Sequence, residues 1–184
     1  GLEGVIYHTL QFCDYYGFEY ADLRGKLPVP LLKIESDGTT QSREQLRTRL
    51  DAFAEGLHPH TRKGEFPMAK HGYFAGIDSG SATTDVVILD QDKTIVAKVI
   101  LPTGAGASNG AQRALDQALA QAGLTQADLT ATVTTGYGRG VIQTGDKSVT
   151  EITCHAKGAH FLNPAVRTVI DIGGQDSKVI RVEA

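Results

Sequence analysis

Two glycine-rich turns, each with an aspartate at the end of the preceding strand, constrain the fold of this chain more than any other feature. The first is GIDSGSATTD at residues 76–85, and the second is DIGGQDSK at residues 171–178. Each follows an apolar run and leads into another β-branched run, so each predicts a β-hairpin. Glycines and small hydroxyl residues let backbone N–H groups surround phosphate oxygens, and an aspartate can hold a hydrated magnesium ion. Two turns of one design predict a nucleotide held between matching hairpins.

The composition excludes several classes of function. The chain has 184 residues, of which 41% are hydrophobic, and its net charge is −3. That length suffices for one or two compact domains, and the charge provides no general attraction to nucleic acid or to acidic membranes. No apolar run is long enough to span a bilayer, and the first residues do not resemble a signal peptide. The two cysteines, Cys13 and Cys154, are far apart in sequence, so we expect no disulfide framework and a cytoplasmic location.

The first third of the chain predicts a small α/β segment followed by a linker. Residues 5–7 and 29–34 are expected strands, and a capping box at Ser42 opens a helix that Gly56 is expected to stop. Residues 1–55 are too few for a comfortable core of their own and look like the tail end of a larger domain. Residues 56–72 are rich in glycine, proline and histidine without apolar periodicity. Metal binding by these histidines is an alternative, but their spacing is irregular, so we favour a linker.

From residue 73 the pattern predicts an antiparallel meander of three strands, then a helix, a strand, a second helix and a final hairpin. Asn109 is the expected N-cap of the first helix, and Gly123 marks its C-terminal end. Ser148 and Glu151 form a second capping box, for a helix that ends before Pro164. The expected strands cover residues 73–77, 84–89, 94–101, 131–135, 166–172 and 178–182.

This order of elements is that of a ribonuclease-H-like half-domain, from which the actin, sugar-kinase and heat-shock ATPase superfamily is built. Within that superfamily, four ordered motifs resemble the activator ATPases of 2-hydroxyacyl-CoA dehydratases and the related ATPase subunits of benzoyl-CoA reductase. The motifs are GIDSGSATTD, TGYGR (residues 135–139), EITCHAKGA (residues 151–159) and DIGGQDSK. The resemblance implies an α/β fold in which residues 73–184 form an actin-like ATPase half-domain with a mixed five-stranded sheet.

Residues 1–55 resemble the end of a 2-hydroxyacyl-CoA dehydratase subunit instead. The resemblance rests on GVIYH at residues 4–8, FCD at 12–14, ESD at 35–37 and QLRTR at 45–49. The order along the chain is then dehydratase tail, linker and activator head. We therefore expect the chain to be a piece of a natural fusion between the two partners.

The resemblance implies an ATP-driven electron pump. In such activators, ATP binding and hydrolysis change the angle between two helices that flank a [4Fe–4S] cluster shared by a homodimer. The activator then docks on its dehydratase, or on a benzoyl-CoA-reductase-like component, and delivers one low-potential electron. The implied cofactors are ATP, Mg²⁺ and the cluster, and no nucleic-acid or membrane partner is expected.

The resemblance also implies roles for the residues of the two turns. Asp78 and Asp171 are expected to face Mg–ATP from opposite hairpins, and Gln175 to orient an attacking water. For Asp78 the alternative is a turn residue that caps backbone amides, and for Gln175 it is a surface glutamine. The residues expected around the phosphates are Gly76, Ser79, Gly80, Ser81, Thr83, Thr84, Gly173 and Gly174.

Cys154 and Cys13 are the candidate cluster ligands. A lone cysteine on a helix is usually an inert small hydrophobe. Cys154, however, lies in the first turns of its expected helix, where the helix dipole favours a thiolate, and His155 and Lys157 add positive charge. The family's second cluster cysteine lies beyond the second glycine turn, so we expect no stable cluster in this chain alone. Cys13 corresponds to a cluster ligand of the dehydratase, and here we expect an unligated thiol.

Three further interpretations stay open. Tyr137 and Arg139 either support the Cys154 helix or sense the nucleotide. A sugar or acyl kinase of the same superfamily would use the same phosphate turns, but it needs a substrate base, for which no clear candidate exists, and it leaves EITCHAKGA unexplained. The third interpretation is a non-catalytic interaction fragment.

Overall fold

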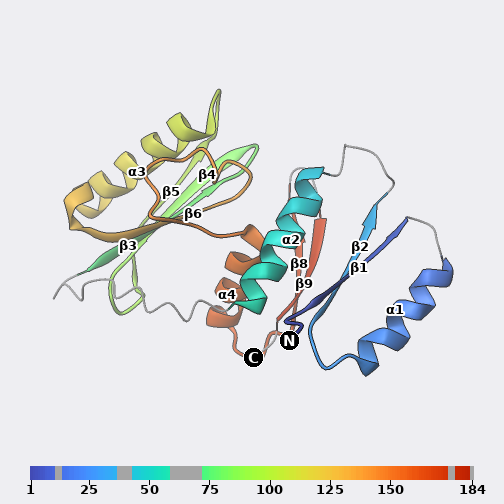
Figure 1. Cartoon of the computed structure of the whole chain (residues 1–184). Coiled ribbons are helices and arrows are strands. Elements are labelled where there is room, and N and C mark those ends of the chain that lie inside the picture. Colours follow the sequence, from blue (N-terminus) through green and yellow to red (C-terminus); the bar gives the residue numbers. More distant parts are fainter. Residues whose placement is uncertain (11–13, 37–42, 59–71, 174–176, 183–184) are drawn as a thin grey trace. The chain divides into compact units, whose positions relative to one another are not determined.

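The computed structural model describes residues 1–10, 14–36, 43–58, 72–173 and 177–182. The chain forms two compact units, Gly1–Arg62 and Lys63–Ala184 (Figure 1). The capping residue Ser42 and the expected site residues Cys13, Gly174 and Gln175 lie outside the described residues, as does most of the expected linker. Among the described residues, no helix is both long and apolar enough to cross a membrane.

The first unit is built on a parallel pair of strands. β1 (Val5–Leu10) pairs with β2 (Leu31–Ser36) from Val5 opposite Leu31 to Leu10 opposite Ser36. Parallel neighbours need a crossover connection, and here α1 (Asp14–Lys26) supplies it. The sequence analysis missed α1, because its few apolar residues are spread around the helix instead of forming one stripe.

α2 (Arg43–Leu57) completes this unit and corrects one expectation. Gly56 does not stop the helix, because helical hydrogen bonding continues to His58, whose N–H donates to the Ala54 carbonyl at 3.1 Å. A side chain at Gly4 would come within 2.9 Å of Leu57 and of Phe53. The last turn of α2 is therefore held by close apolar packing, which outweighs the weak helix propensity of glycine.

The second unit contains a five-stranded mixed sheet with the order β5-β4-β3-β6-β7. The first three strands form an antiparallel meander, and β6 and then β7 add on in parallel beside β3. This is the mixed five-stranded sheet that the sequence analysis predicted. The bounds are Tyr73–Ser79 for β3, Thr83–Leu89 for β4, Ile95–Pro102 for β5, Leu129–Thr135 for β6 and Lys147–Ser148 for β7.

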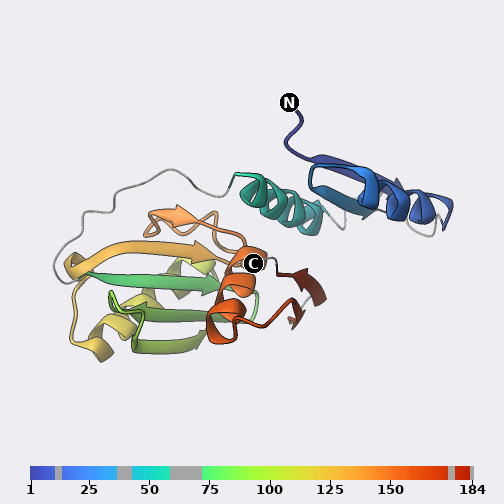
Figure 2. The same cartoon turned by 90° about the horizontal axis from the view of Figure 1, so that it is seen from below.

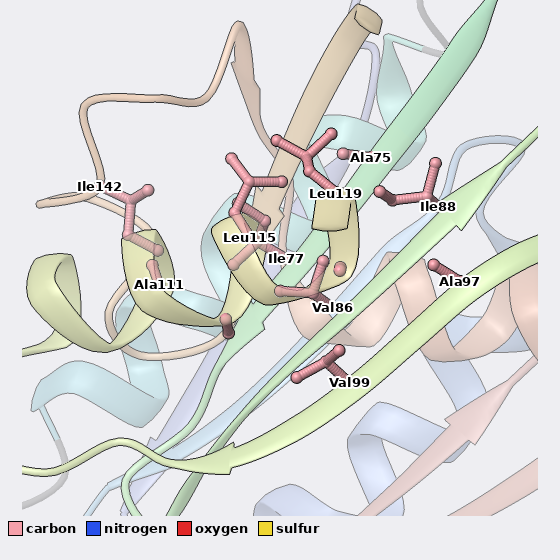
Figure 3. Packing of buried hydrophobic residues seen from close by; sticks show 12 residues of the cluster. Ala75, Ile77, Val86, Ile88, Ala97, Val99, Ala111, Leu115, Leu119 and Ile142 are labelled. Carbon is pink, nitrogen blue, oxygen red and sulfur yellow. The ribbon is translucent and has the colours of Figure 1, made fainter. Parts of the chain in front are cut away.

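α3 (Ala107–Ala122) covers one face of this sheet and builds the core with it (Figures 1 and 3). Alternate residues of the strands point to this face, so Ile77, Val86 and Ile88 are buried there while their chain neighbours are not. Three of the six buried residues of α3 are alanines and one is Gly110, and these small residues let the helix approach the sheet closely. Leu115 fills the centre of the interface and is fully buried.

The two ends of α3 test the expected caps. Gly123 closes the helix in the left-handed conformation, with φ of 67°, as expected. The N-cap, however, is Gly106 and not Asn109. The helix begins earlier because it starts against the end of β5: a Cβ on Gly110 would come within 2.7 Å of the Thr103 carbonyl oxygen. Only glycine allows this approach, and it places Asn109 inside the first turn.

The remaining elements follow the sheet. α4 (Glu151–Leu162) is capped by Thr150, whose hydroxyl accepts a hydrogen bond from the Thr153 N–H at 3.4 Å. The capping box expected at Ser148 is therefore wrong, because Ser148 belongs to β7 and pairs with Thr134 of the sheet. A short 3₁₀ helix (Gln126–Asp128) precedes β6, and the antiparallel hairpin of β8 (Thr168–Ile172) and β9 (Ser177–Arg181) ends the described chain.

Candidate functional site

A pocket of about 150 Å³ lies where β3 ends, beside the start of α4 and the hairpin of β8 and β9. Figure 2 shows the arrowheads of β3 and β6 pointing toward α4. All residues that line the pocket come from the second unit. They are Asp78, Gly80, Ser81, Ala82, Thr83, Gly136, Tyr137, Glu151, His155, Asp171, Gly173 and Lys178.

The two strand-end aspartates meet in this pocket through a histidine. Asp78 lies near the end of β3 and Asp171 near the end of β8. His155 of α4 contacts both: its Nδ1 lies 3.2 Å from Asp171 Oδ2, and its Nε2 lies 3.9 Å from Asp78 Oδ2. The structure thus brings together the two acidic residues that the glycine-rich turns placed far apart in sequence.

The turn after β6 packs directly on the end of β3. Gly136 has a φ of 82°, and a Cβ there would come within 2.5 Å of the Ser79 carbonyl oxygen and would also collide with a carboxylate oxygen of Asp78. The Gly138 N–H donates to the same Ser79 carbonyl at 3.0 Å. The TGYGR segment therefore needs glycine at residue 136 so that the Asp78 carboxylate can keep its place in the pocket.

A buried carboxylate in the pocket wall anchors the start of α4. Glu151 is only 5% exposed. Its Oε2 lies 3.5 Å from Nη1 of Arg139, and its Oε1 lies 3.4 Å from Nζ of Lys178. Lys178 also reaches Asp171, with Nζ 3.9 Å from Oδ2. The turn after β6, the hairpin of β8 and β9 and the start of α4 thus share one connected set of charged groups.

The charges shift two pKa values in this region. The pKa of His155 is raised, chiefly by its interaction with Asp78 and further by the nearby Asp171, while burial opposes the shift. The pKa of Asp85, which pairs with Asp78 across β3 and β4, is raised by burial and by the Asp78 charge, and its hydrogen bond from Thr83 opposes this. Several carboxylates at one place favour a bound cation.

The residues fit a magnesium ion with a phosphate ligand. Two carboxylates, Asp78 and Asp171, face the same pocket, and Mg²⁺ is commonly held by one or two carboxylates together with water and substrate phosphates. Within the described residues, no group of three or more His, Cys, Asp or Glu is arranged to hold a metal on its own. Ser79 Oγ and Asp85 Oδ1 are buried nearby and have no hydrogen-bond partner among the described residues, so each can accept a further hydrogen bond.

The structure places the expected phosphate residues in two groups. Gly80, Ser81, Thr83 and Gly173 line the pocket, although the Gly80 N–H is occupied by the Thr83 carbonyl at 2.9 Å. The other described residues of the set, Gly76, Ser79 and Thr84, do not line it. Gly76 lies within β3, while Ser79 and Thr84 are fully buried, and the Thr84 hydroxyl is hydrogen-bonded to that of Thr103 at 3.0 Å.

Cys154 lies beside the pocket and not in its wall. It is half-buried in α4, and its backbone N–H makes the first hydrogen bond of the helix, to the Thr150 carbonyl at 3.1 Å. Its chain neighbour His155 does line the pocket. The candidate thiol is thus one residue away from a side chain that touches both aspartates.

The sequence analysis did not assign Glu151, His155 or Lys178 to the pocket. The signal was present in part, because Glu151 and His155 are four residues apart in EITCHAKGA and so face the same side of a helix. What the sequence did not indicate was that this side faces the ends of β3 and β8.

Comparison with known proteins identifies the family. The model of the BadF/BadG/BcrA/BcrD ATPase family matches residues 75–184, which is more than half of the chain. The chain belongs to this ATPase family. Residues 1–57 match a different model, that of the 2-hydroxyglutaryl-CoA dehydratase D-component. Both resemblances inferred from the motifs are thereby confirmed.

Several relatives of the ATPase part are named as dehydratase activators. The activator of lactoyl-CoA dehydratase from Anaerotignum propionicum is 52% identical over 111 residues, which are 60% of this chain and 42% of the relative. Component A of the (R)-2-hydroxyglutaryl-CoA dehydratase of Acidaminococcus fermentans has been solved, is 46% identical and superposes with a TM-score of 0.58 over 61% of this chain and 43% of its own.

A second solved relative contains a nucleotide analogue. The activator of the 2-hydroxyisocaproyl-CoA dehydratase from Clostridium difficile, with bound ADPNP, is 39% identical and has a TM-score of 0.57 over 60% of this chain and 41% of its own. The two structural matches confirm the actin-like ATPase fold of the second unit. The chain spans less than half the length of these relatives.

Proposed function

We propose that the second unit is the ATP-binding half of an activator that couples ATP hydrolysis to low-potential electron transfer toward an acyl-CoA dehydratase or a related reductase. The observation that carries this proposal is the pocket in which Asp78 and Asp171 meet beside the first turns of α4, the helix that contains Cys154. Membership of the ATPase family and a relative with bound ADPNP support it.

In this proposal the described residues bind and position Mg–ATP. Asp78 and Asp171 hold the magnesium ion from the ends of two strands, and the hydroxyls of Ser81 and Thr83 face the phosphates from the first turn. Lys178 offsets phosphate charge from the second hairpin. Gln175 orients the attacking water, as inferred from its place in the second turn.

Cys154 is the residue of the second unit that we propose as a ligand of a [4Fe–4S] cluster. When bound, such a cluster supplies low-potential one-electron chemistry, and it is held by four thiolates. Cys154 provides one of them, and in the homodimer we propose, its symmetry mate provides another. Cys13 is proposed as a ligand on the dehydratase side. Within the part of the chain that the structure describes, Cys154 is the only cysteine, so the remaining thiolates must come from other residues.

The first unit supports a dehydratase component as the partner. It resembles a dehydratase D-component and is part of the same polypeptide as the ATPase unit. We propose that residues 1–55 and 73–184 come from a fusion of the two partners, joined by the linker 56–72, in a cytoplasmic protein. Such a tether keeps the activator near its electron acceptor, because it replaces a bimolecular encounter with an intramolecular one.

Calorimetric titration with ADPNP and Mg²⁺ tests the nucleotide site. We expect Asp78→Asn to weaken binding by about tenfold, which corresponds to about 1.4 kcal/mol, because it removes one of the two carboxylates proposed to hold Mg²⁺. Asp116→Asn is the matched control, because Asp116 is an exposed carboxylate on α3 that accepts a hydrogen bond from Gln112. Equal affinity of the two variants would contradict the proposed magnesium site.

A further inference from the structure

α4 contributes two side chains to the wall of the pocket, Glu151 and His155, and they behave differently. Glu151 is buried and held from both sides, by Arg139 of the turn after β6 and by Lys178 of β9. His155 is about one-third exposed and lies in the pocket between the two strand-end aspartates. One end of the helix is therefore fixed, and the next turn reaches the place where the magnesium ion would bind.

We propose that His155 is a positioning residue that ties α4 to Asp78 and Asp171, and that Mg–nucleotide displaces it. This inference rests on the proposed function, because it names the residue through which the nucleotide site acts on the helix of Cys154.

The argument begins with competition for the same oxygen atoms. The Nδ1 of His155 lies 3.2 Å from Asp171 Oδ2, and its Nε2 lies 3.9 Å from Asp78 Oδ2. A magnesium ion binds carboxylate oxygens at about 2.1 Å and keeps an octahedral set of ligands around it. An ion held by both aspartates would fill the space between them that the imidazole now fills. The ion and His155 therefore compete for the Oδ2 atoms of Asp78 and Asp171.

The fixed end of α4 turns this displacement into a helix movement. Glu151 stays anchored by Arg139 and Lys178, and Thr150 caps the same end. When His155 leaves the aspartates, α4 loses this attachment to the pocket and can turn about its Glu151 end. Cys154, next to His155 in the chain, moves with it. Such a switch requires a ligand that binds more tightly to one of the two positions of α4 than to the other.

The experiment compares His155→Ala with His155→Asn and with the control Lys157→Ala in the full chain. Alanine keeps helix propensity, so α4 is expected to form in both alanine variants. Asparagine carries an amide N–H near the position of Nδ1 and retains one contact to Asp171. Lys157 is an exposed cation on the same helix outside the pocket. Binding of Mg²⁺ with ADPNP is measured by calorimetry, and alkylation of Cys154 is followed by peptide-resolved mass spectrometry, which separates it from Cys13.

We expect His155→Ala to bind Mg–ADPNP about fivefold more tightly than the unaltered chain, because the protein no longer spends binding free energy on opening the bridge. The Mg–ADPNP affinity of His155→Asn should lie between those of His155→Ala and the unaltered chain. The affinity of Lys157→Ala should match that of the unaltered chain. Mg–ADPNP should change the alkylation rate of Cys154 several-fold in the unaltered chain and leave it unchanged in His155→Ala. Weaker binding by His155→Ala would overturn the proposal and make His155 a nucleotide ligand. An unaltered nucleotide effect on Cys154 in that variant would overturn it as well.

Hydrogen exchange without any ligand separates this inference from the proposed function. If His155 ties α4 to the aspartates, amides in the first two turns of α4 exchange faster in His155→Ala than in Lys157→Ala. Equal exchange in the two variants contradicts the bridge even when nucleotide binds. Failure of the unaltered chain to bind Mg–ADPNP contradicts the proposed function and the displacement step, while the exchange result still decides whether the bridge exists.

Discussion

Gly136 shows how a single backbone position controls the site. Its positive φ and its contact with the Ser79 carbonyl leave no room for a side chain, and the Asp78 carboxylate lies on the same side. An L-residue in the left-handed region costs on the order of 1–2 kcal/mol, and the collision adds to that cost. The TGYGR segment therefore shapes the pocket through a glycine as well as through Tyr137.

We predict that Gly136→Ala lowers the free energy of unfolding by about 2 kcal/mol or more, because strain and overpacking act together. Urea denaturation measures the change. Gly140→Ala is the matched control in the same loop, since a Cβ there meets no atom within 4 Å and its φ is not in the left-handed region. A loss of stability in the control equal to that of Gly136→Ala would refute this explanation.

A second residue-scale prediction concerns pH. Hydrogen bonds from the Thr125 hydroxyl and N–H lower the pKa of Asp128 below its ordinary value of 3.8. A depressed pKa in the folded state stabilises the fold above the unfolded value, and this contribution is lost as the pH falls through the folded pKa. We therefore expect the unaltered chain to be more stable than Asp128→Asn near pH 6, and the difference to shrink below pH 3.8. Thermal unfolding across this range checks it, and a difference independent of pH would argue against the charged cap.

At the scale of elements, α3 and its sheet hold the second unit together. Leu115 is fully buried among residues of β3 and β4, and the alanines beside it bring the helix close to the strands (Figure 3). The helical spacing of these residues was visible in the sequence, so the helix was predicted. The strands of the meander beneath it were predicted from their β-branched runs.

We predict that Leu115→Ala destabilises the second unit by about 3–5 kcal/mol, because it removes buried methyl groups and leaves a cavity that the closely packed helix cannot fill. The same substitution type at an exposed apolar residue, Ile100→Ala, is the control, since Ile100 is 71% exposed on β5. Denaturant unfolding measures both. A small effect at Leu115 would mean that α3 relaxes more freely against the sheet than its packing indicates.

Other elements were not predictable from local pattern, for identifiable physical reasons. α1 lacks an apolar stripe, so its helical state is evident only from the parallel pairing of β1 and β2, which requires a crossover. β7 has two residues and exists because of its pairing with β6. The site residues also divide into those that a local sequence pattern predicts and those that depend on tertiary packing. The strand-end aspartates were recognisable from their turns, whereas the place of His155 depends on where α4 docks.

At the scale of the whole molecule, the pocket belongs to one unit only. Every residue that lines it lies in the second unit, and the first unit resembles a different protein. Ligand binding therefore stabilises the part of the chain that contains the ATPase motifs.

We predict that saturating Mg–ADPNP slows hydrogen exchange in β3 and β8, which carry Asp78 and Asp171, and leaves exchange in β1, β2 and α1 unchanged. At a ligand concentration of 100 times Kd the stabilisation amounts to about 2.7 kcal/mol. Exchange measured by peptide-resolved mass spectrometry provides both the test and its internal control. Protection spread evenly over both units would show that the first unit takes part in nucleotide binding.

The separation of the pocket residues along the chain has a consequence for folding. Asp78 comes from the first strand of the second unit, whereas Asp171 and Lys178 come from its last hairpin. The meander and α3 are local in sequence and can form early, but the pocket requires closure of the whole intervening chain, and such non-local contacts form slowly. During synthesis, the hairpin of β8 and β9 must therefore leave the ribosome before Asp171 and Lys178 can join Asp78 in the pocket.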